Sequence, residues 1–220
     1  MRLPKLLIIC PGALFPLDMA SKVRIFNILT AASEKFETTF LANCDINDVP
    51  ENEIFLRPVC SQVILLPFRN RQNPAARTVH RIFSTLSYYI TGVPFDFYYS
   101  SLINLYPDRI KKAIGNTTFD VVLFEYWFGS ASVEIFKKTG TPCVLDMHDI
   151  LWQKISSSNR TTDNPLMKKY QNFLNRQYRR FEESTWFHFD GLISINNAEE
   201  KYVREKLSLH IPVLDRKSVV

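Results

Sequence analysis

The sequence lacks the short motifs with which many enzymes hold a phosphate or a metal ion. It has only six glycines in 220 residues, and neither Gly-x-Gly-x-x-Gly nor Gly-x-x-x-x-Gly-Lys-Ser/Thr occurs. A dinucleotide cradle or a P-loop is therefore not predicted. The missing glycine motif also argues against a nicotinamide-dependent oxidoreductase, which is the third alternative after the two given below. No Asp-x-Asp occurs, and no two His or Cys residues stand at a spacing typical of metal ligands. We accordingly expect no metal ion and no cofactor.

Paired cysteines, long apolar runs and a strong charge excess are also missing. The four cysteines include no Cys-x-x-Cys pair, and Cys10 and Cys143 lie in apolar runs, which indicates buried thiols in a reducing compartment. No run approaches the ~20 apolar residues that span a bilayer, and no signal peptide is recognisable. We expect a cytoplasmic protein. The net charge of +5 suits a phosphate-bearing ligand or an anionic membrane surface, but it is too small to indicate nucleic acid.

Apolar runs alternate with segments of helical periodicity along the whole chain. The runs are continuous rather than alternating, which is typical of parallel strands buried on both faces. We therefore predict an α/β fold with a doubly wound, mostly parallel, Rossmann-like sheet in one domain, residues 1–214. The expected strands are 5–10, 36–43, 62–68, 119–128, 142–149, 190–195 and 210–214. The expected helices are 21–34, 74–91, part of 94–114 with a break near Pro107, 130–139, 165–185 and 197–207, and residues 156–164 are expected to form a loop.

One strand ends in an unusual group of side chains. The run "PCVLDMHD" (142–149) passes from apolar residues to Asp146, His148 and Asp149. Ligands of open parallel sheets bind beyond the carboxyl ends of the strands, and a neighbouring carboxylate can orient an imidazole and stabilise its cation. We therefore favour a functional role for His148 over a structural one.

Polar residues follow the other strands as well, and we expect them to share one rim with His148. Each has a plainer alternative: a simple turn at Pro11-Gly12, solvated cations in the first helix, or core aromatics after the fourth strand. The candidates are Gly12, Ser21, Lys22 and Arg24 after the first strand, Glu125, Tyr126 and Trp127 after the fourth, and Asn196 and Glu199 after the sixth.

Four segments in this order resemble a known family. They are "LLIICPGALFPLDMASKVRIFNILTAAS" (6–33), "FDVVLFEYWF" (119–128), "PCVLDMHDI" (142–150) and "FEESTWFHFDGLISINNAEEKYV" (181–203). The ordered set resembles the N-terminal, acceptor-side domain of the family-4 glycosyltransferases, which are retaining enzymes of the GT-B fold. One departure is the stretch 19–22, which stands where the family often has glycine before the first helix.

The resemblance implies a function. The family moves a sugar from a nucleotide-sugar donor of the UDP or GDP type to a glycan or lipid-linked acceptor, without a metal, and a role in cell-surface polysaccharide synthesis follows from this. By resemblance, His148 with Asp149 is catalytic and contacts the donor sugar, while Gly12, Ser21, Lys22 and Arg24 lie near the donor phosphates. Glu125, Tyr126 and Trp127 face the acceptor, and we assign Asn196 and Glu199 to the same side.

The family's second, donor-binding domain is absent from these 220 residues. The final residues 215–220, "DRKSVV", match one reading frame of a common sequencing-library adapter, so we expect a non-native tail on a truncated and inactive half-enzyme. The alternative is a stand-alone α/β domain that pairs with a separately encoded donor domain.

The helix expected at 165–185 is basic and amphipathic. It could rest on an anionic membrane surface and meet a lipid-linked acceptor. We favour the alternative, in which its apolar stripe packs in the core.

Overall fold

The computed structural model describes residues 2–68, 105–158, 165–207 and 211–215. The helix predicted at 74–91 and the first part of the segment 94–114 lie outside the described residues, as do residues 159–164 of the predicted loop.

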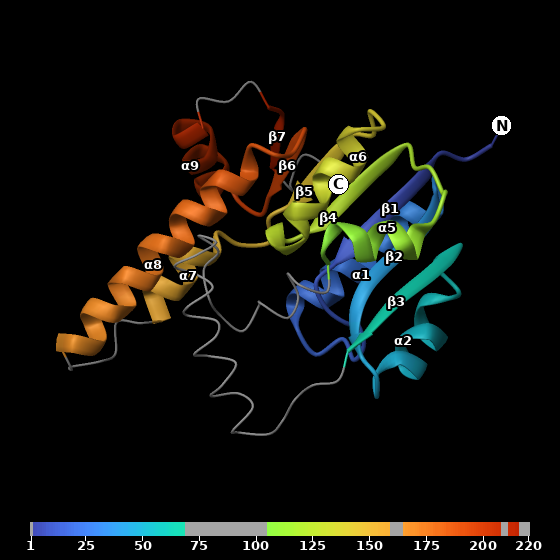
Figure 1. Ribbon diagram of the computed structural model, residues 1–220, viewed down its shortest axis with the longest axis horizontal. Coiled ribbons are helices and arrows are strands. Elements are labelled where there is room, and N and C mark those ends of the chain that lie inside the picture. The colour runs from blue at the N-terminus through green and yellow to red at the C-terminus, as the bar shows by residue number, and fades with distance from the viewer. Residues whose placement is uncertain (1, 69–104, 159–164, 208–210, 216–220) are drawn as a thin grey trace.

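Seven parallel strands form a single sheet in the order β3-β2-β1-β4-β5-β6-β7. Figure 1 shows them as adjacent arrows. The prediction of a mostly parallel, Rossmann-like sheet is confirmed. The strands are β1 (Lys5–Cys10), β2 (Glu37–Asp45), β3 (Gln62–Phe68), β4 (Val121–Glu125), β5 (Cys143–Asp146), β6 (Gly191–Ser194) and β7 (Val213–Asp215).

Helices cover both faces of this sheet, as the continuous apolar runs predict. They are α1 (Ala20–Ser33), α2 (Val49–Leu56), α5 (Pro107–Ile114), η1 (Trp127–Ser132, a 3₁₀-helix), α6 (Val133–Lys137), α7 (Leu151–Ser158), α8 (Pro165–Trp186) and α9 (Asn197–Leu207). Among these described helices, none is long and apolar enough to cross a bilayer.

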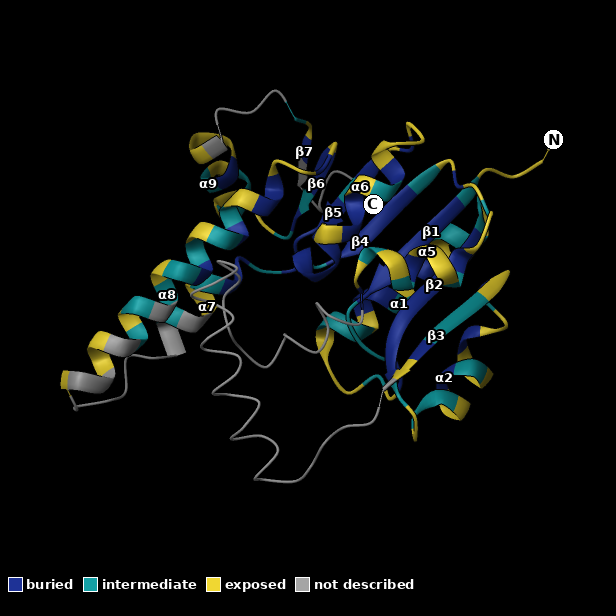
Figure 2. Cartoon of the chain, viewed as in Figure 1, coloured by how far each residue is buried: buried dark blue, intermediate teal, exposed yellow. Residues whose placement is uncertain are grey.

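The side chains of β1 show the two faces directly. Leu7 and Ile9 belong to one apolar cluster, which includes residues of α5, α6, α8 and α9. Leu6 and Ile8 belong to a second cluster, which includes residues of α1 and α2. Burying one such side chain contributes about 1.5–3 kcal/mol, so every residue of the run adds stability. In Figure 2 the central strands are dark blue and the outward surfaces of the helices are largely yellow.

Two helices differ from the sequence predictions. No element was predicted at 49–56, where α2 forms with Ile54 and Phe55 exposed and Asn52 fully buried. This inverted pattern gives no apolar stripe. Residues 156–158, predicted as loop, complete α7. Pro107 begins α5, where proline suits the first helical turn, and the predicted break there is not tested because residues 94–104 lie outside the described residues.

The segment after β4 is also built differently. The strand predicted to reach residue 128 ends at Glu125, and η1 follows at Trp127. Only glycine fits at position 129 without a shift of its neighbours, because an added Cβ would lie 2.9 Å from the Phe124 ring. The change from strand to 3₁₀-helix places Glu125 at the rim of the sheet.

Candidate functional site

The strand order reverses between β1 and β4. The chain runs from β1 outward through β2 and β3 and then returns to the other side of β1 at β4. Such a switch point is where open α/β sheets bind ligands. Glu125 ends β4 and Asp146 ends β5, and the two residues are register partners. Two carboxyl groups therefore lie side by side at this rim.

Four ionisable side chains are buried together here. Arg24, Glu125, Asp146 and His148 are exposed by 9%, 1%, 0% and 4%. Nη2 of Arg24 donates to both oxygens of Asp146, at 2.7 and 2.6 Å. Nε2 of His148 lies 2.5 Å from Oε2 of Glu125. We call these four residues the rim cluster. Buried charges are normally paired in this way, because an unpaired one is very costly.

Burial changes the protonation of both acids in the rim cluster. It raises the pKa of Glu125 to about 8, although the positive charge of Arg24 acts in the opposite direction. It raises the pKa of Asp146 to about 6, with a further upward contribution from Glu125, while His148 and Arg24 lower it. At neutral pH Glu125 can therefore keep its proton and donate it to the imidazole. The pair can hold or pass one proton without a net charge in the core.

The residue that holds the imidazole was not foreseen. Sequence reasoning expected Asp146 or Asp149 to orient His148, but Asp146 pairs with Arg24, and Asp149 pairs with Lys154 at 3.0 Å. The reason is the backbone of His148, whose φ of 58° turns the ring away from its neighbours in sequence and toward β4.

Tyr126 completes this arrangement. Its ring stacks on the His148 ring, with centroids 4.2 Å apart and planes 13° from parallel. Tyr126 also has a positive φ, 65°. Positive φ is uncommon for residues other than glycine, although histidine adopts it more often than most, and strained residues cluster at active sites and ligand clamps. Two such residues in contact mark this rim as a candidate site.

The rim cluster also contains three potential metal ligands. Single ligand atoms of Glu125, Asp146 and His148 lie within 4.8 Å of one another. However, the imidazole nitrogen and one Glu125 oxygen already contact each other, and both Asp146 oxygens accept from Arg24. The arginine's fixed positive charge would repel a cation beside Asp146. The donor set therefore does not fit a resident metal ion, and the expectation of a metal-free site remains a prediction.

The residues predicted near the donor phosphates have different surroundings. A Cβ added to Gly12 would meet no atom within 4 Å, so the loop after β1 has open space on that side. Ser21 is half-buried in the first turn of α1. Lys22 is held by Asp18 at 2.8 Å and by the carbonyl of Pro16 at 3.0 Å. Arg24, by contrast, is committed to the rim cluster.

Only some of the residues predicted to face the acceptor lie at the rim. Glu125 and Tyr126 belong to the rim, whereas Trp127 is only 2% exposed and packs against Phe181. The side chain of Asn196 accepts from the N–H of Glu199 at 2.9 Å, which caps the start of α9. This Asn-x-x-Glu spacing is a helix-start signal that sequence reasoning left unused.

Asn52 is a second residue that sequence reasoning missed. Its Oδ1 accepts from the N–H groups of Leu14 and Phe15, both at 2.9 Å, and its Nδ2 donates to the carbonyls of Phe15 and Asp48. A buried asparagine on α2 therefore fixes the loop that follows β1. Because Asn52 stands between Glu51 and Glu53, the sequence gives no sign that it is buried.

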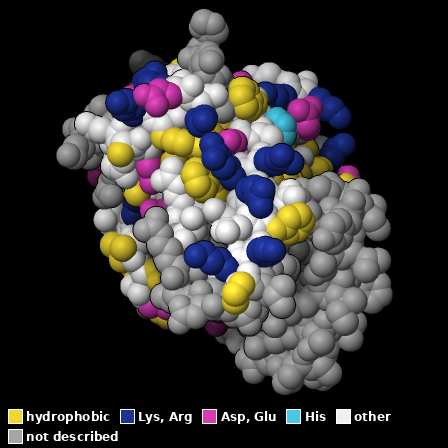
Figure 3. All heavy atoms as spheres, turned by 90° about the vertical axis from the view of Figure 1, so that its left-hand side faces the viewer, with side chains coloured by type: hydrophobic (Ala, Val, Ile, Leu, Met, Phe, Trp, Pro, Cys, Tyr) yellow, Lys and Arg dark blue, Asp and Glu magenta, His cyan; other side chains and the backbone are white. Residues whose placement is uncertain are grey.

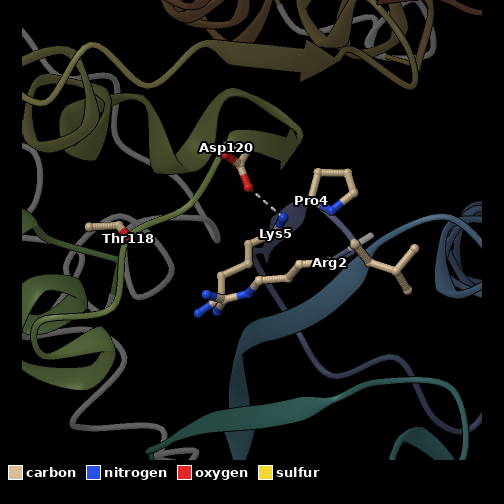
Figure 4. Close-up of a pocket in the computed structure, with 6 residues that line it drawn as sticks. Arg2, Pro4, Lys5, Thr118 and Asp120 are labelled. Carbon is tan, nitrogen blue, oxygen red and sulfur yellow. Dashed lines mark hydrogen bonds between the residues drawn. The ribbon is translucent and has the colours of Figure 1, made fainter.

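Two hollows lie at the opposite edge of the sheet. The first, of about 470 Å³, is lined by Arg2, Leu3, Pro4, Lys5, Thr118 and Asp120, and in it the backbone N–H of Lys5 donates to Asp120 at 2.7 Å (Figure 4). The second, of about 520 Å³, lies between α5 and α6. Neither hollow is lined by a residue of the rim cluster.

Comparison with known proteins places the fold. No family model matches the sequence, and no curated protein matches it. Solved structures do match. UDP-N-acetylglucosamine 2-epimerase from Rickettsia bellii is 10% identical over 97% of this chain and 44% of its own, with a TM-score of 0.54. Sucrose-phosphate synthase from Thermosynechococcus elongatus is 13% identical over 97% and 47%, with a TM-score of 0.55. A UDP-glucosyltransferase from Polygonum tinctorium is 11% identical over 98% and 52%, with a TM-score of 0.52.

These similarities establish the architecture. The chain has the Rossmann-like fold of GT-B proteins, and it spans about half the length of the solved structures that it resembles.

Proposed function

We propose that the chain is the N-terminal, acceptor-side half of a retaining GT-B glycosyltransferase of the family-4 type. It would act on a UDP- or GDP-type donor and a glycan or lipid-linked acceptor in polysaccharide synthesis. The observation that carries this proposal is the buried Glu125–His148 pair, stacked on Tyr126 at the switch point of the sheet. A pair that holds one proton suits a reaction in which a hydroxyl group loses one.

The similar structures support a nucleotide sugar as the donor. Two are named as acting on UDP sugars, the 2-epimerase and the UDP-glucosyltransferase. A third, TcCGT1, contains UDP and is 11% identical, with a TM-score of 0.56. Since the chain spans about half of each of these, most donor-binding groups would come from a second domain.

The roles of the rim residues follow from how firmly each is held. Lys22 pairs with the exposed carboxylate of Asp18, and a pair with an exposed partner is worth about 0–1 kcal/mol, so Lys22 can exchange Asp18 for a donor phosphate at little cost. Breaking the buried Arg24–Asp146 pair would cost about 3–5 kcal/mol. In this proposal Lys22, Gly12 and Ser21 therefore approach the phosphates, and Arg24 acts by holding Asp146.

The acceptor side is assigned by the same reasoning. His148 contacts the donor sugar, and Glu125 and Tyr126 support it from the acceptor side. The catalytic role of Asp149 stays a prediction, and so does the acceptor-side role of Trp127, Asn196 and Glu199.

Substitution of Gly12 tests the donor site. Because a side chain at Gly12 would enter open space, we expect Gly12→Leu to leave the free energy of unfolding within about 0.5 kcal/mol of the wild type. We also expect it to reduce the thermal stabilisation produced by UDP or a UDP sugar. The matched control is Ala31→Leu, which adds the same side chain at an exposed position of α1. Equal ligand-induced stabilisation of both variants would contradict a donor site at this loop.

The half-enzyme reading has its own test. Group transfer needs donor and acceptor held together with water excluded, so we expect negligible sugar transfer by the 220-residue chain alone. Sustained turnover by the purified chain would refute this reading.

A stand-alone partner domain is the alternative, and the half-length match to the solved structures favours it equally. A donor-domain coding region that follows in the same frame would support the half-enzyme. A separate neighbouring gene would support the partner domain.

Contact with a membrane surface is a further part of the proposal. Lys168, Lys169, Arg176 and Arg180 of α8 are exposed, whereas Tyr178 is buried. The apolar side of α8 thus contributes to the core, and the basic side faces outward. Figure 3 shows Lys and Arg side chains gathered across this side of the molecule. We expect the protein to sediment with liposomes that contain anionic lipid but not with neutral ones. Equal partitioning to both kinds of liposome would contradict contact with an anionic membrane.

A further inference from the structure

The loop between β5 and α7 carries His148, and its backbone donors are all accounted for. The N–H of Met147 donates to the carbonyl of Ile193 at 3.0 Å, and that of Asp149 donates to the carbonyl of Met147 at 2.7 Å. The N–H of His148 lies 3.3 Å from Oδ1 of Asp146. This part of the loop is held by β6 and by the loop itself.

The next three donors are held by carboxylates from distant parts of the chain. The first N–H groups of a helix have no partner inside it, and α7 is preceded by Ile150, a residue type that cannot cap it. Both oxygens of Glu182 fill this role, accepting from the N–H groups of Leu151 and Trp152 at 2.9 Å each. Glu199 accepts more weakly from the N–H of Ile150, at 3.4 Å.

Glu182 is unusual among helix caps. It belongs to α8, about 30 residues further along the chain, and it is 1% exposed. Its burial raises its pKa to about 8, and the two backbone N–H groups act in the opposite direction. A side-chain cap at residue 150 would accept only from the second or third N–H of the helix, and Ile150 is itself 2% exposed. Glu182 instead holds the first two N–H groups, next to the loop that carries His148, although a buried carboxyl is costly. This placement indicates a role in holding the loop as well as the helix.

The conformation of His148 shows what the fixed loop does. Three residues before Leu151, His148 holds a φ of 58°, a conformation that costs a residue with a Cβ about 1–2 kcal/mol and that the surrounding contacts must offset. One end of the loop is fixed by β5 and β6, and the other end is fixed by Glu182. Release of the second end would let His148 relax toward an ordinary φ, and its ring would then leave Glu125.

We propose that Glu182 is a positioning residue for His148. By binding the N–H groups of Leu151 and Trp152, it fixes the loop that turns the imidazole onto Glu125 and Tyr126, and Glu199 assists at Ile150. The importance of this positioning for sugar transfer rests on the proposed function. The positioning itself can be measured without any substrate.

The test compares Glu182→Gln with Glu183→Gln in the 220-residue chain. Glutamine keeps one acceptor oxygen but turns an NH₂ group toward the second backbone N–H, so at least one bond is lost. The control changes the adjacent residue, which binds Arg179 and Tyr202 instead. Amide hydrogen exchange reports the loop, and the ¹⁵N signal of Nε2 of His148 reports its contact with Glu125.

In Glu182→Gln we expect about ten- to a hundredfold faster exchange of the Leu151 and Trp152 amides. We also expect a shift of the His148 signal toward that of a solvent-exposed imidazole. Glu183→Gln should show neither change. Unchanged exchange would overturn the proposal. Faster exchange with an unchanged His148 signal would also overturn it, because Glu182 would then be a helix cap only.

Glu199→Gln keeps the proposal testable if Glu182→Gln does not fold. It removes the weaker contact, so we expect about three- to tenfold faster exchange at Ile150 and a smaller shift of the His148 signal in the same direction. Absence of both changes would contradict the proposal. Since neither readout involves a nucleotide sugar, failure of the wild type to bind one would overturn the proposed function alone.

Discussion

Replacing Glu125 by Gln tests the protonation of the rim cluster. The ordinary pKa of a glutamate, 4.5, is raised to about 8 by burial in the folded chain. Between these two values the folded state binds more protons than the unfolded state, so stability is fully present below 4.5 and falls as the pH rises toward 8. The slope is about 1.4 kcal/mol per pH unit. From about pH 5.5 to about pH 7.5, Glu125 alone should withdraw about 3 kcal/mol.

Glutamine has nearly the same shape and does not ionise, so this loss should be absent in Glu125→Gln. We therefore expect the stability of the variant, relative to the wild type, to improve by about 3 kcal/mol between these two pH values. Asp146 and Glu182 also have raised pKa values, about 6 and about 8, but they are present in both proteins and largely cancel in the comparison.

Urea denaturation at the two pH values, followed by tryptophan fluorescence, measures the effect. Glu51→Gln, an exposed position on α2, controls for removal of a surface carboxyl. A constant difference between wild type and Glu125→Gln at both pH values would refute the reasoning. Glu125 would then be ionised throughout, as the anionic partner of an imidazolium.

Two further predictions concern the same cluster. At His148, with its φ of 58°, β-branched valine should be less stable than asparagine by about 1–2 kcal/mol in urea denaturation, and equal stability would show that the loop relaxes freely. Arg24→Met should cost about 3–5 kcal/mol by leaving Asp146 unpaired. Because Arg24 lowers the pKa of Asp146, the variant's Asp146 takes up its proton at a higher pH, and the loss should shrink as the pH falls toward about 6. Lys22→Met, which breaks a surface pair, should cost about 0–1 kcal/mol in the same assay, and a similar loss for both would contradict the buried pairing.

The architecture could be predicted from the sequence because each strand is buried on both faces. The run 6–10 sends alternate side chains into two different cores, so it contains no polar position, and a continuous apolar run favours a parallel strand. The same argument placed Glu125 and His148 at one rim. Parallel strands end at the same rim of a sheet, and the continuous apolar runs predict parallel strands.

The partner choices within the rim could not be predicted, because they depend on backbone angles after the strands. A single residue at positive φ takes the ring of His148 from its neighbours in sequence to Glu125 on another strand. The start of α7 was missed for a related reason. Its cap comes from Glu182 on another helix, so no residue beside Leu151 carries the usual signal.

The cost of the rim cluster is itself an argument for function. Well-packed apolar residues in place of a buried ion pair are often as stable or more stable, so folding alone does not require Arg24 and Asp146 to be charged. The rim cluster adds a carboxyl whose pKa lies well above its ordinary value, and two contacting residues at positive φ. Each of these features is costly, and in the described part of the chain they meet where the strand order reverses, between β1 and β4. Strained residues and perturbed pKa values cluster at functional sites, which supports the function proposed for the rim cluster.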